Sequence, residues 1–421
     1  MTLSDDQRWA GLPAELTAAF RPIVDAIAEG AAARDLAREL PAAEVAALRR
    51  AGLTRARLPR DRGGLGLGWR DLARLLIAVA EADANVPQIL RGHLALVEQT
   101  LTTADRSFAE RWSDRIALGE IAGNAWSEAS GSTTARASTE LHEDADGTLR
   151  ISGRKYYTTG SIFAEWTDTV AHRPADGVDV AALVRLDQPG VRVHDDWDGF
   201  GQRLTGTGTI EFDGAVVDPG DVLPVADRFG YQTALYQLVL LAVLAGIAHA
   251  AVRDAAAAVR ARTRVYSHGT ASRVRDDPQI QGLIGELSAS AFAVEAAVLA
   301  VADAVEDAAR AAVGARDALG GEASAAAREA AGLAEIRAAQ AQSFVTAEVQ
   351  RLTSRLFDAL GASATSREAG LDRHWRNART VSSHNPVLYK QRWIGVWELQ
   401  DELPQALWAV GTPARSRSTV R

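Results

Sequence analysis

The most informative segment of the chain lies near its middle and reads Gly153-Arg154-Lys155-Tyr156-Tyr157-Thr158-Thr159-Gly160-Ser161. Its first half continues an alternation of apolar and polar residues that starts at Thr148, which is typical of a half-buried strand. Further short alternating stretches follow at 167–171, 178–186 and 207–212, and turn signals such as Asp146-Gly147 separate them. Residues from about 116 to 223 are therefore predicted to form a compact antiparallel β domain.

The segments on either side of this domain are helical in pattern. Apolar residues recur at helical spacing between Ala14 and about Ser113. After Asp227 the chain is rich in alanine and predicts three long helices at 231–264, 279–319 and 322–360, with Gly320-Gly321 as a hairpin. We therefore predict an α+β fold with a helical domain at 1–115, a β domain at 116–225 and a helical bundle at 226–421.

Composition excludes several classes of protein. The 421 residues contain no cysteine, which removes disulfides, thiolate metal sites and thiol nucleophiles. The net charge of -8 argues against a nucleic-acid partner, because phosphate binding requires a basic face. The eight histidines show no metal-ligand spacing, so no metal site is expected.

The sequence also predicts a cytoplasmic protein with no membrane partner. The longest apolar run, Leu238 to Ala248, is shorter than the roughly 20 residues that cross a bilayer. The N-terminus carries Asp5 and Asp6 and lacks the apolar stretch of a secretory signal.

Two clusters in the β domain place small polar residues beside aromatic ones: Gly123 to Glu128 and Lys155 to Ser161. A flat ring system such as a flavin is bound by strand ends of this kind, with hydrogen bonds for its polar edge and apolar contacts for its faces. The alternative is that the serines and threonines merely close the strands.

Several motifs carry a resemblance to a known fold. They are Asn124 to Glu128 with Gly131-Ser132, Gly153 to Ser161, Arg262-Thr263-Arg264, Asp277-Pro278 with Gln281, Phe357 to Ala362 and Arg376 to Thr380. In this order they resemble the acyl-CoA dehydrogenase fold over nearly the whole chain. The resemblance implies an N-terminal helical domain, a central β-barrel and a C-terminal four-helix bundle.

The positions that hold the catalytic base of the dehydrogenases carry no carboxylate here. One lies a few residues beyond the stretch that matches Arg376 to Arg379, where this chain has His384-Asn385. The other lies near the start of the first bundle helix, and residues 229–252 contain no Asp or Glu. A helix predicted from Pro386 to about Leu399 would place His384 just outside a helix N-terminus, whose positive end disfavours imidazolium.

These features are similar to the flavin-dependent monooxygenase branch of the fold, of which dibenzothiophene monooxygenase is a member. The resemblance implies an enzyme that takes reduced FMN from a separate NAD(P)H-dependent flavin reductase and forms a C4a-hydroperoxyflavin with O2. It would oxygenate a small hydrophobic substrate, such as an organosulfur or heteroaromatic compound, and would assemble as a homotetramer.

The resemblance also implies roles for individual residues. His384, His93, Asn124 and Ser161 would serve oxygen transfer, and Trp126 and Phe163 would line the substrate pocket. FMN would be bound by Asn124, Ser127, Tyr157, Thr158, Thr159, Ser161, Arg262 and Arg264.

Several alternatives stay open at this point. His93 could be a satisfied core residue, and Arg262 and Arg264 could be solvated side chains, of which either could reach the phosphate. Residues 266–269 depart from the form that dehydrogenases show near their adenine site, which favours FMN over FAD. An FAD-dependent acyl-CoA dehydrogenase and an inactive family member acting as a binding protein are the rival functions.

Overall fold

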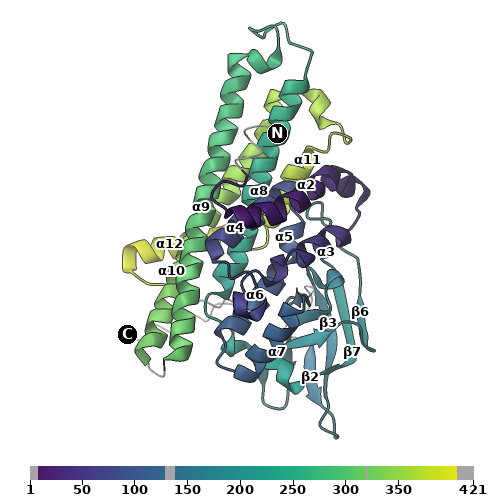
Figure 1. Ribbon diagram of the computed structural model, residues 1–421, viewed down its shortest axis with the longest axis vertical. Coiled ribbons are helices and arrows are strands. Elements are labelled where there is room, and N and C mark those ends of the chain that lie inside the picture. Colours follow the sequence, from purple (N-terminus) through teal and green to yellow (C-terminus); the bar gives the residue numbers. More distant parts are fainter. Residues whose placement is uncertain (1–7, 129–137, 319–320, 405–421) are drawn as a thin grey trace, which may run out of the picture.

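The computed structural model describes residues 8–128, 138–318 and 321–404. The first part of the chain is helical, as predicted, and its helices lie between the long C-terminal helices and the sheet (Figure 1). Its helices are α2 (Ala14–Ala37), α3 (Ala42–Arg50), α4 (Trp69–Ala82), α5 (Val86–Ile89), α6 (Arg91–Thr102) and α7 (Arg106–Ala117).

The middle of the chain forms a sheet. Its strands are β1 (Ala122–Ala125), β2 (Glu140–Glu143), β3 (Leu149–Tyr156), β4 (Trp166–Arg173), β5 (Val178–Arg185), β6 (Val191–Val193), β7 (Thr209–Val217) and β8 (Val222–Pro224). The strand order is β6-β7-β3-β2-β4-β5-β8, and β1 pairs with β4 outside this path.

The sheet differs from the antiparallel barrel that the sequence predicts. Both β1 and β2 pair with β4 in parallel, so the sheet is mixed. Along the described strands the hydrogen-bonded path ends at β6 and β8 without closing. The sequence could not show this, because side chains alternate in the same way in parallel and antiparallel strands. Parallel pairing of β1 with β4 is possible because a long connection, which includes β2 and β3, separates the two strands.

The C-terminal part is built on α8 (Gln232–Ala261), α9 (Pro278–Asp317) and α10 (Gly321–Arg355), close to the three predicted helices. These run alongside one another (Figure 1), and the shorter α11 (Asp372–Val381) and α12 (Val387–Gln400) pack on them. The described part therefore has three long helices with two short ones. The predicted hairpin Gly320-Gly321 falls partly outside the described residues.

By length and composition, α8 and α9 are apolar enough to cross a membrane. In α8, however, 83% of the most apolar window is buried inside the protein, so its hydrophobicity is that of a core helix. In α9 only 33% of that window is buried, and Phe292 on this helix is 75% exposed. Much of the apolar surface of α9, including Phe292, is therefore not covered by the residues that the structure describes.

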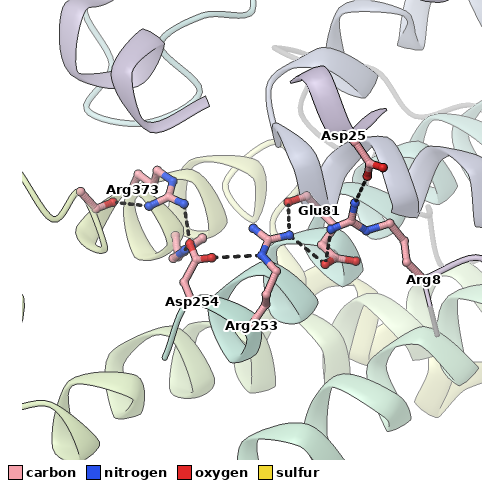
Figure 2. A network of polar contacts seen from close by, with 8 residues as sticks. Arg8, Asp25, Glu81, Arg253, Asp254 and Arg373 are labelled. Carbon is pink, nitrogen blue, oxygen red and sulfur yellow. Dashed lines mark hydrogen bonds and ion pairs between the residues drawn. The ribbon is translucent and has the colours of Figure 1, made fainter. Parts of the chain in front are cut away.

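A network of charged side chains fixes α8 against its neighbours (Figure 2). Arg253 of α8 reaches Glu81 of α4 at 2.8 Å and also pairs with Asp254 at 3.1 Å. On its other side, Asp254 accepts hydrogen bonds from Arg373 and His374 of α11, at 2.5 and 2.9 Å. The network therefore fixes α11, from which the chain continues towards His384.

A second ion pair joins the sheet to the start of α8. Arg228 lies 2.9 Å from Asp168 of β4, and both side chains are fully buried. Arg228 also donates to Gln232 at 2.8 Å and stacks over the Trp126 ring, 5.3 Å from its centre. Since Arg228 lies four residues before the start of α8 at Gln232, this pair sets where the helix begins relative to the sheet.

We predict that Asp168→Ala destabilises the fold by about 3–5 kcal/mol, because it leaves the Arg228 charge buried without a partner. Urea unfolding followed by circular dichroism measures this loss. The control is Asp176→Ala, which breaks the exposed pair of Arg173 and Asp176 and should shift the midpoint little. Equal shifts for the two variants would contradict the assignment.

Candidate functional site

The predicted polar clusters meet where β1, the turn after β3 and the α5–α6 segment approach one another. A Cβ added at Gly123 would lie 2.3 Å from Ser161 Oγ, and one at Gly92 would lie 2.8 Å from Asn124 Cβ. Neither approach is possible for a residue with a side chain. The two glycines therefore let β1 lie directly against Ser161 and against α6.

Hydroxyl groups fix the turn after β3. Thr158 Oγ1 donates to the Gly208 carbonyl at 3.0 Å, and the hydroxyls of Thr159 and Thr207 lie 2.7 Å apart. Ser161 Oγ lies 3.1 Å from Thr167 Oγ1. Each hydroxyl keeps a free lone pair, so the same groups can hold the turn and also accept from a ligand.

Asn124 carries a buried group that the described protein leaves without a partner. Its side chain is 6% exposed, its backbone N–H donates to Thr159 O at 3.2 Å, and its Oδ1 has no hydrogen bond among the described residues. Buried polar atoms are normally paired. An unpaired acceptor at the meeting point of these elements fits an N–H group on the edge of a flavin.

His384 reaches the same place from the loop between α11 and α12. Its Nε2 lies 3.0 Å from Gln88 Nε2 of α5, so the unprotonated ring nitrogen accepts from the amide. The next residue, Asn385, donates to Gln237 of α8 at 2.9 Å and accepts from Gln342 of α10 at 2.9 Å. Helix α12 begins at Val387, one residue later than predicted, with Pro386 as its cap.

The imidazole of His384 is neutral at physiological pH. Burial, together with the positive charge of Arg91, lowers its pKa to about 3. The sequence led us to expect a neutral ring because of a helix dipole, whereas the structure points to burial as the main cause. His384 can therefore accept or donate a hydrogen bond without acting as a strong acid.

His93 is tied to the backbone through both ring nitrogens. The ring is 0% exposed, Nε2–H donates to Thr54 O at 2.7 Å, and Nδ1 accepts from Ala122 N at 3.3 Å. These contacts link β1 to the short helix η1 (Leu53–Arg55). The role of His93 in oxygen transfer stays a prediction.

The aromatic residues of the candidate site differ in how tightly their rings are packed. Trp126 is held under Arg228, and Phe163, in the short helix η3 (Ser161–Phe163), packs against the main core. Tyr157 is 46% exposed, has φ of +62° and lies 6.0 Å from Trp197. Ser127 is exposed and bridges to Tyr156. The motif residues Gly131-Ser132 lie outside the described residues.

Arg262 and Arg264 lie at the far end of α8. The Arg262 guanidinium donates to the carbonyls of Leu360 and, at 3.2 Å, of Arg264, while the Arg264 side chain is exposed. Tyr236, near the start of α8, and Arg262 are separated by about 39 Å at 1.5 Å per residue. The structure therefore does not bring these arginines to Asn124 within one chain.

Sequence reasoning missed Gln88 and Arg91. Both are polar residues in the mainly apolar stretch 86–97, which also contains His93, and they lie three positions apart and therefore on one face of the chain. The Gln88 side chain is 1% exposed, and its Oε1 has no partner in the described part of the chain. The spacing of Gln88 and Arg91, close to His93 in a mainly apolar segment, was the signal that could have found them.

Comparison with known proteins follows the same division of the chain. Residues 124–215 match the middle domain of acyl-CoA dehydrogenases, and residues 238–388 match the C-terminal domain. The FMN-bound crystal structure of TdsC from Paenibacillus sp. A11-2 is 30% identical, with a TM-score of 0.83, over 93% of this chain and 99% of that one. The chain belongs to the acyl-CoA dehydrogenase family, in its flavin-dependent monooxygenase branch.

Two curated relatives of this branch align over most of the chain. Dibenzothiophene monooxygenase of Mycolicibacterium goodii is 27% identical over 85% of this chain and 87% of its own length. The "Probable FMNH2-dependent monooxygenase SfnC" of Pseudomonas putida is 26% identical over 93% of this chain and 96% of its own length.

Metal ligands do not gather in the described structure. Within residues 8–128, 138–318 and 321–404, no group of three or more His, Cys, Asp or Glu side chains is placed to hold a metal ion.

We predict that His93 makes the fold sensitive to acid. Burial lowers its pKa to about 4, so between pH 6.5 and about 4 the unfolded chain binds a proton that the folded chain does not. Stability is therefore lost as the pH falls through this window, by about 2 kcal/mol from this ring between pH 6.5 and 5.

Urea unfolding at pH 7 and pH 5 tests this. The His93→Gln variant should lose less stability between the two pH values than the wild type does. The exposed His142 provides the matched control, since His142→Gln should keep the wild-type pH dependence. An unchanged pH dependence in His93→Gln would show that His93 titrates normally.

Proposed function

We propose that this chain is the oxygenase component of a two-component monooxygenase that uses reduced FMN and O2 to oxygenate a small hydrophobic substrate. The observation that carries the proposal is the unpaired, buried Oδ1 of Asn124 beside Ser161, close to the segment where Gln88 holds a neutral His384. A site of neutral donors and acceptors suits oxygen transfer, which needs hydrogen bonds and the exclusion of water.

The site lacks what a dehydrogenase needs. The base of an acyl-CoA dehydrogenase is a carboxylate, and α8 carries no Asp or Glu before Asp254. The carboxylate nearest to Asn124 in register, Asp168, is fully buried against Arg228. This favours oxygenation over removal of a proton from a thioester.

The residues that would hold FMN are Asn124, Ser127, Tyr157, Thr158, Thr159 and Ser161. When bound in its reduced form, FMN supplies two electrons and two protons, so that one atom of O2 enters the substrate and the other leaves as water. His384, held by Gln88, would offer a neutral hydrogen-bonding group to the reacting oxygen. Trp126 and Phe163 would shape the substrate pocket, and the relatives named for dibenzothiophene and FMNH2 support this class of reaction.

The working form would be a homotetramer of three-domain chains divided at 1–115, 116–225 and 226–421. In each chain α11 would complete a four-helix bundle with α8, α9 and α10. Arg262 and Arg264 lie too far along α8 to reach the phosphate of an FMN bound at Asn124 of the same chain, and α9 has an apolar surface to cover. A neighbouring subunit would therefore bring its arginines to the phosphate.

The assembly is tested by light scattering, which should give the mass of four copies of the chain. The mass of a monomer would contradict this assembly.

The cellular setting follows from the same proposal. A separate NAD(P)H-dependent flavin reductase would supply reduced FMN, the enzyme would work in the cytoplasm, and neither a membrane nor nucleic acid would be a partner.

The function is tested with FMN-loaded protein, a flavin reductase and 18O2, offered dibenzothiophene and indole as substrates. Mass spectrometry should find one 18O atom in the product. In the anaerobic arm, an acyl-CoA should leave oxidised flavin unchanged. Bleaching of the flavin in that arm would instead support the dehydrogenase alternative, and failure of the protein to bind any flavin would support a binding protein.

We predict that His384→Ala lowers product formation by about 100-fold or more, because the oxygen-transfer step loses its hydrogen-bonding partner. FMN affinity, measured by fluorescence quenching, should stay within about twofold of the wild-type value. The control variant His142→Ala removes an exposed histidine and should keep full activity. Undiminished product from His384→Ala would remove His384 from the mechanism.

A further inference from the structure

Arg91 is a cation without an acidic partner at the candidate site. It is the first residue of α6, and its guanidinium lies over the Tyr236 ring, 4.7 Å from the ring centre. Its Nε is buried and has no hydrogen-bond partner in the described chain. Burial lowers the pKa of its guanidinium, and no carboxylate among the described residues offsets this effect.

The groups around Arg91 do not neutralise it. His384 is neutral and feels the Arg91 charge directly. Burial raises the pKa of Tyr236 to about 12, so that phenol is neutral as well. Gln88 and Gln237 carry no charge, and the nearby carboxylate Asp168 is already paired with Arg228. Among the residues that the structure describes, the positive charge of Arg91 therefore stays uncompensated at this site.

An uncompensated charge in a partly buried site is costly unless a ligand provides the counter-charge. Elsewhere in the described chain, buried or half-buried arginines such as Arg34, Arg57 and Arg228 pair with carboxylates. Arg91 departs from this pattern at the place where a substrate would meet His384. The Tyr236 ring also holds the guanidinium in place before a ligand binds, so the Arg91 side chain loses less conformational entropy on binding.

We propose that Arg91 binds an anionic oxygen group of the substrate, so that the enzyme acts on a hydrophobic acid such as a sulfinate. This rests on the proposed monooxygenase function and narrows its substrate class. The planar guanidinium matches the two oxygens of a sulfinate or carboxylate in a bidentate pair. The opposite end of such a substrate is apolar and would lie towards Trp126 and Phe163.

The reaction balances for a sulfinate. The sulfur lone pair forms a bond to one oxygen atom of O2, and the O–O bond breaks. The sulfinate becomes a sulfonate, a two-electron oxidation, while the other oxygen leaves as water with the two electrons and two protons that reduced FMN supplies. Arg91 holds the two existing oxygens throughout and takes no part in proton transfer.

A matched pair of probes tests the charge alone. Benzenesulfinate and methyl phenyl sulfoxide share the ring and the need for one further oxygen on sulfur, but only the sulfinate is charged. Their affinities for the wild-type protein loaded with oxidised FMN are measured by isothermal titration calorimetry. We expect the sulfinate to bind about tenfold or more tightly than the sulfoxide.

Variants then assign the preference to Arg91. In Arg91→Met, the dissociation constants of the two probes should lie within about twofold of each other, while the affinity for the sulfoxide stays unchanged. Arg91→Lys should keep part of the preference for the sulfinate. Arg50→Met, at an exposed arginine on α3, is the matched control and should behave as the wild type.

Each other outcome overturns the proposal. If the wild type binds the two probes equally, the site does not recognise an anion. If Arg91→Met weakens the binding of reduced FMN but leaves the preference for sulfinate over sulfoxide intact, the flavin ring rather than the substrate provides the negative charge that Arg91 binds. Because both probes are read by binding, a failure here is separate from a failure of oxygenation, which would show in the 18O2 experiment.

Discussion

The fully buried ion pair of Asp168 and Arg228 is the interaction on which the arrangement of the site depends. Asp168 lies on β4, directly across from Asn124 of β1 in the strand register. Arg228 lies at the entrance to α8 and stacks on Trp126. One contact therefore joins the strand that presents the unpaired Asn124 amide oxygen, the Trp126 ring and the helix that carries Tyr236 and Gln237. Both charges are removed from water, and either one alone would be a buried charge without a partner. The two side chains must therefore stay in contact for the fold to be stable.

Around this pair the protein assembles a site of neutral groups with one exception. The networks at Asp254 and at Gln237, Gln342 and Asn385 hold the loop on which His384 approaches Gln88. Burial keeps that imidazole neutral, and the charge of Arg91 reinforces the effect. The two features are coupled, since a counter-ion bound at Arg91 would weaken the repulsion that lowers the pKa of His384. An anionic substrate bound at Arg91 would thus raise the pKa of the His384 ring.

The order of helices, sheet and long helices could be predicted from the sequence, because alternation and Ala-rich helical spacing are local signals. The long helices α8, α9 and α10 lie close to their predicted ranges. The direction of β1 and β2 relative to β4 was not predictable, since pairing depends on contacts far apart in the chain.

The candidate site was predictable in part. The clusters around Asn124 and Ser161 were marked by unusual residues, whereas Gln88 and Arg91 become notable only once the fold shows which polar groups lack partners. The backbone contacts of His93 likewise depend on η1 and β1 meeting. Motifs thus indicated the chemistry, and packing identified the residues that surround it.

We infer that the meeting point of β1, the turn after β3 and the α5–α6 segment shelters reduced FMN in its reaction with O2. The most direct measurement mixes anaerobically reduced, FMN-loaded protein with oxygenated buffer in a stopped-flow spectrometer and follows flavin absorbance. We expect a phase whose spectrum differs from those of both reduced and oxidised FMN, which lasts longer than any phase seen with free FMN and is lost in His384→Ala. Direct conversion to oxidised FMN, with immediate release of hydrogen peroxide as in free solution, would contradict it.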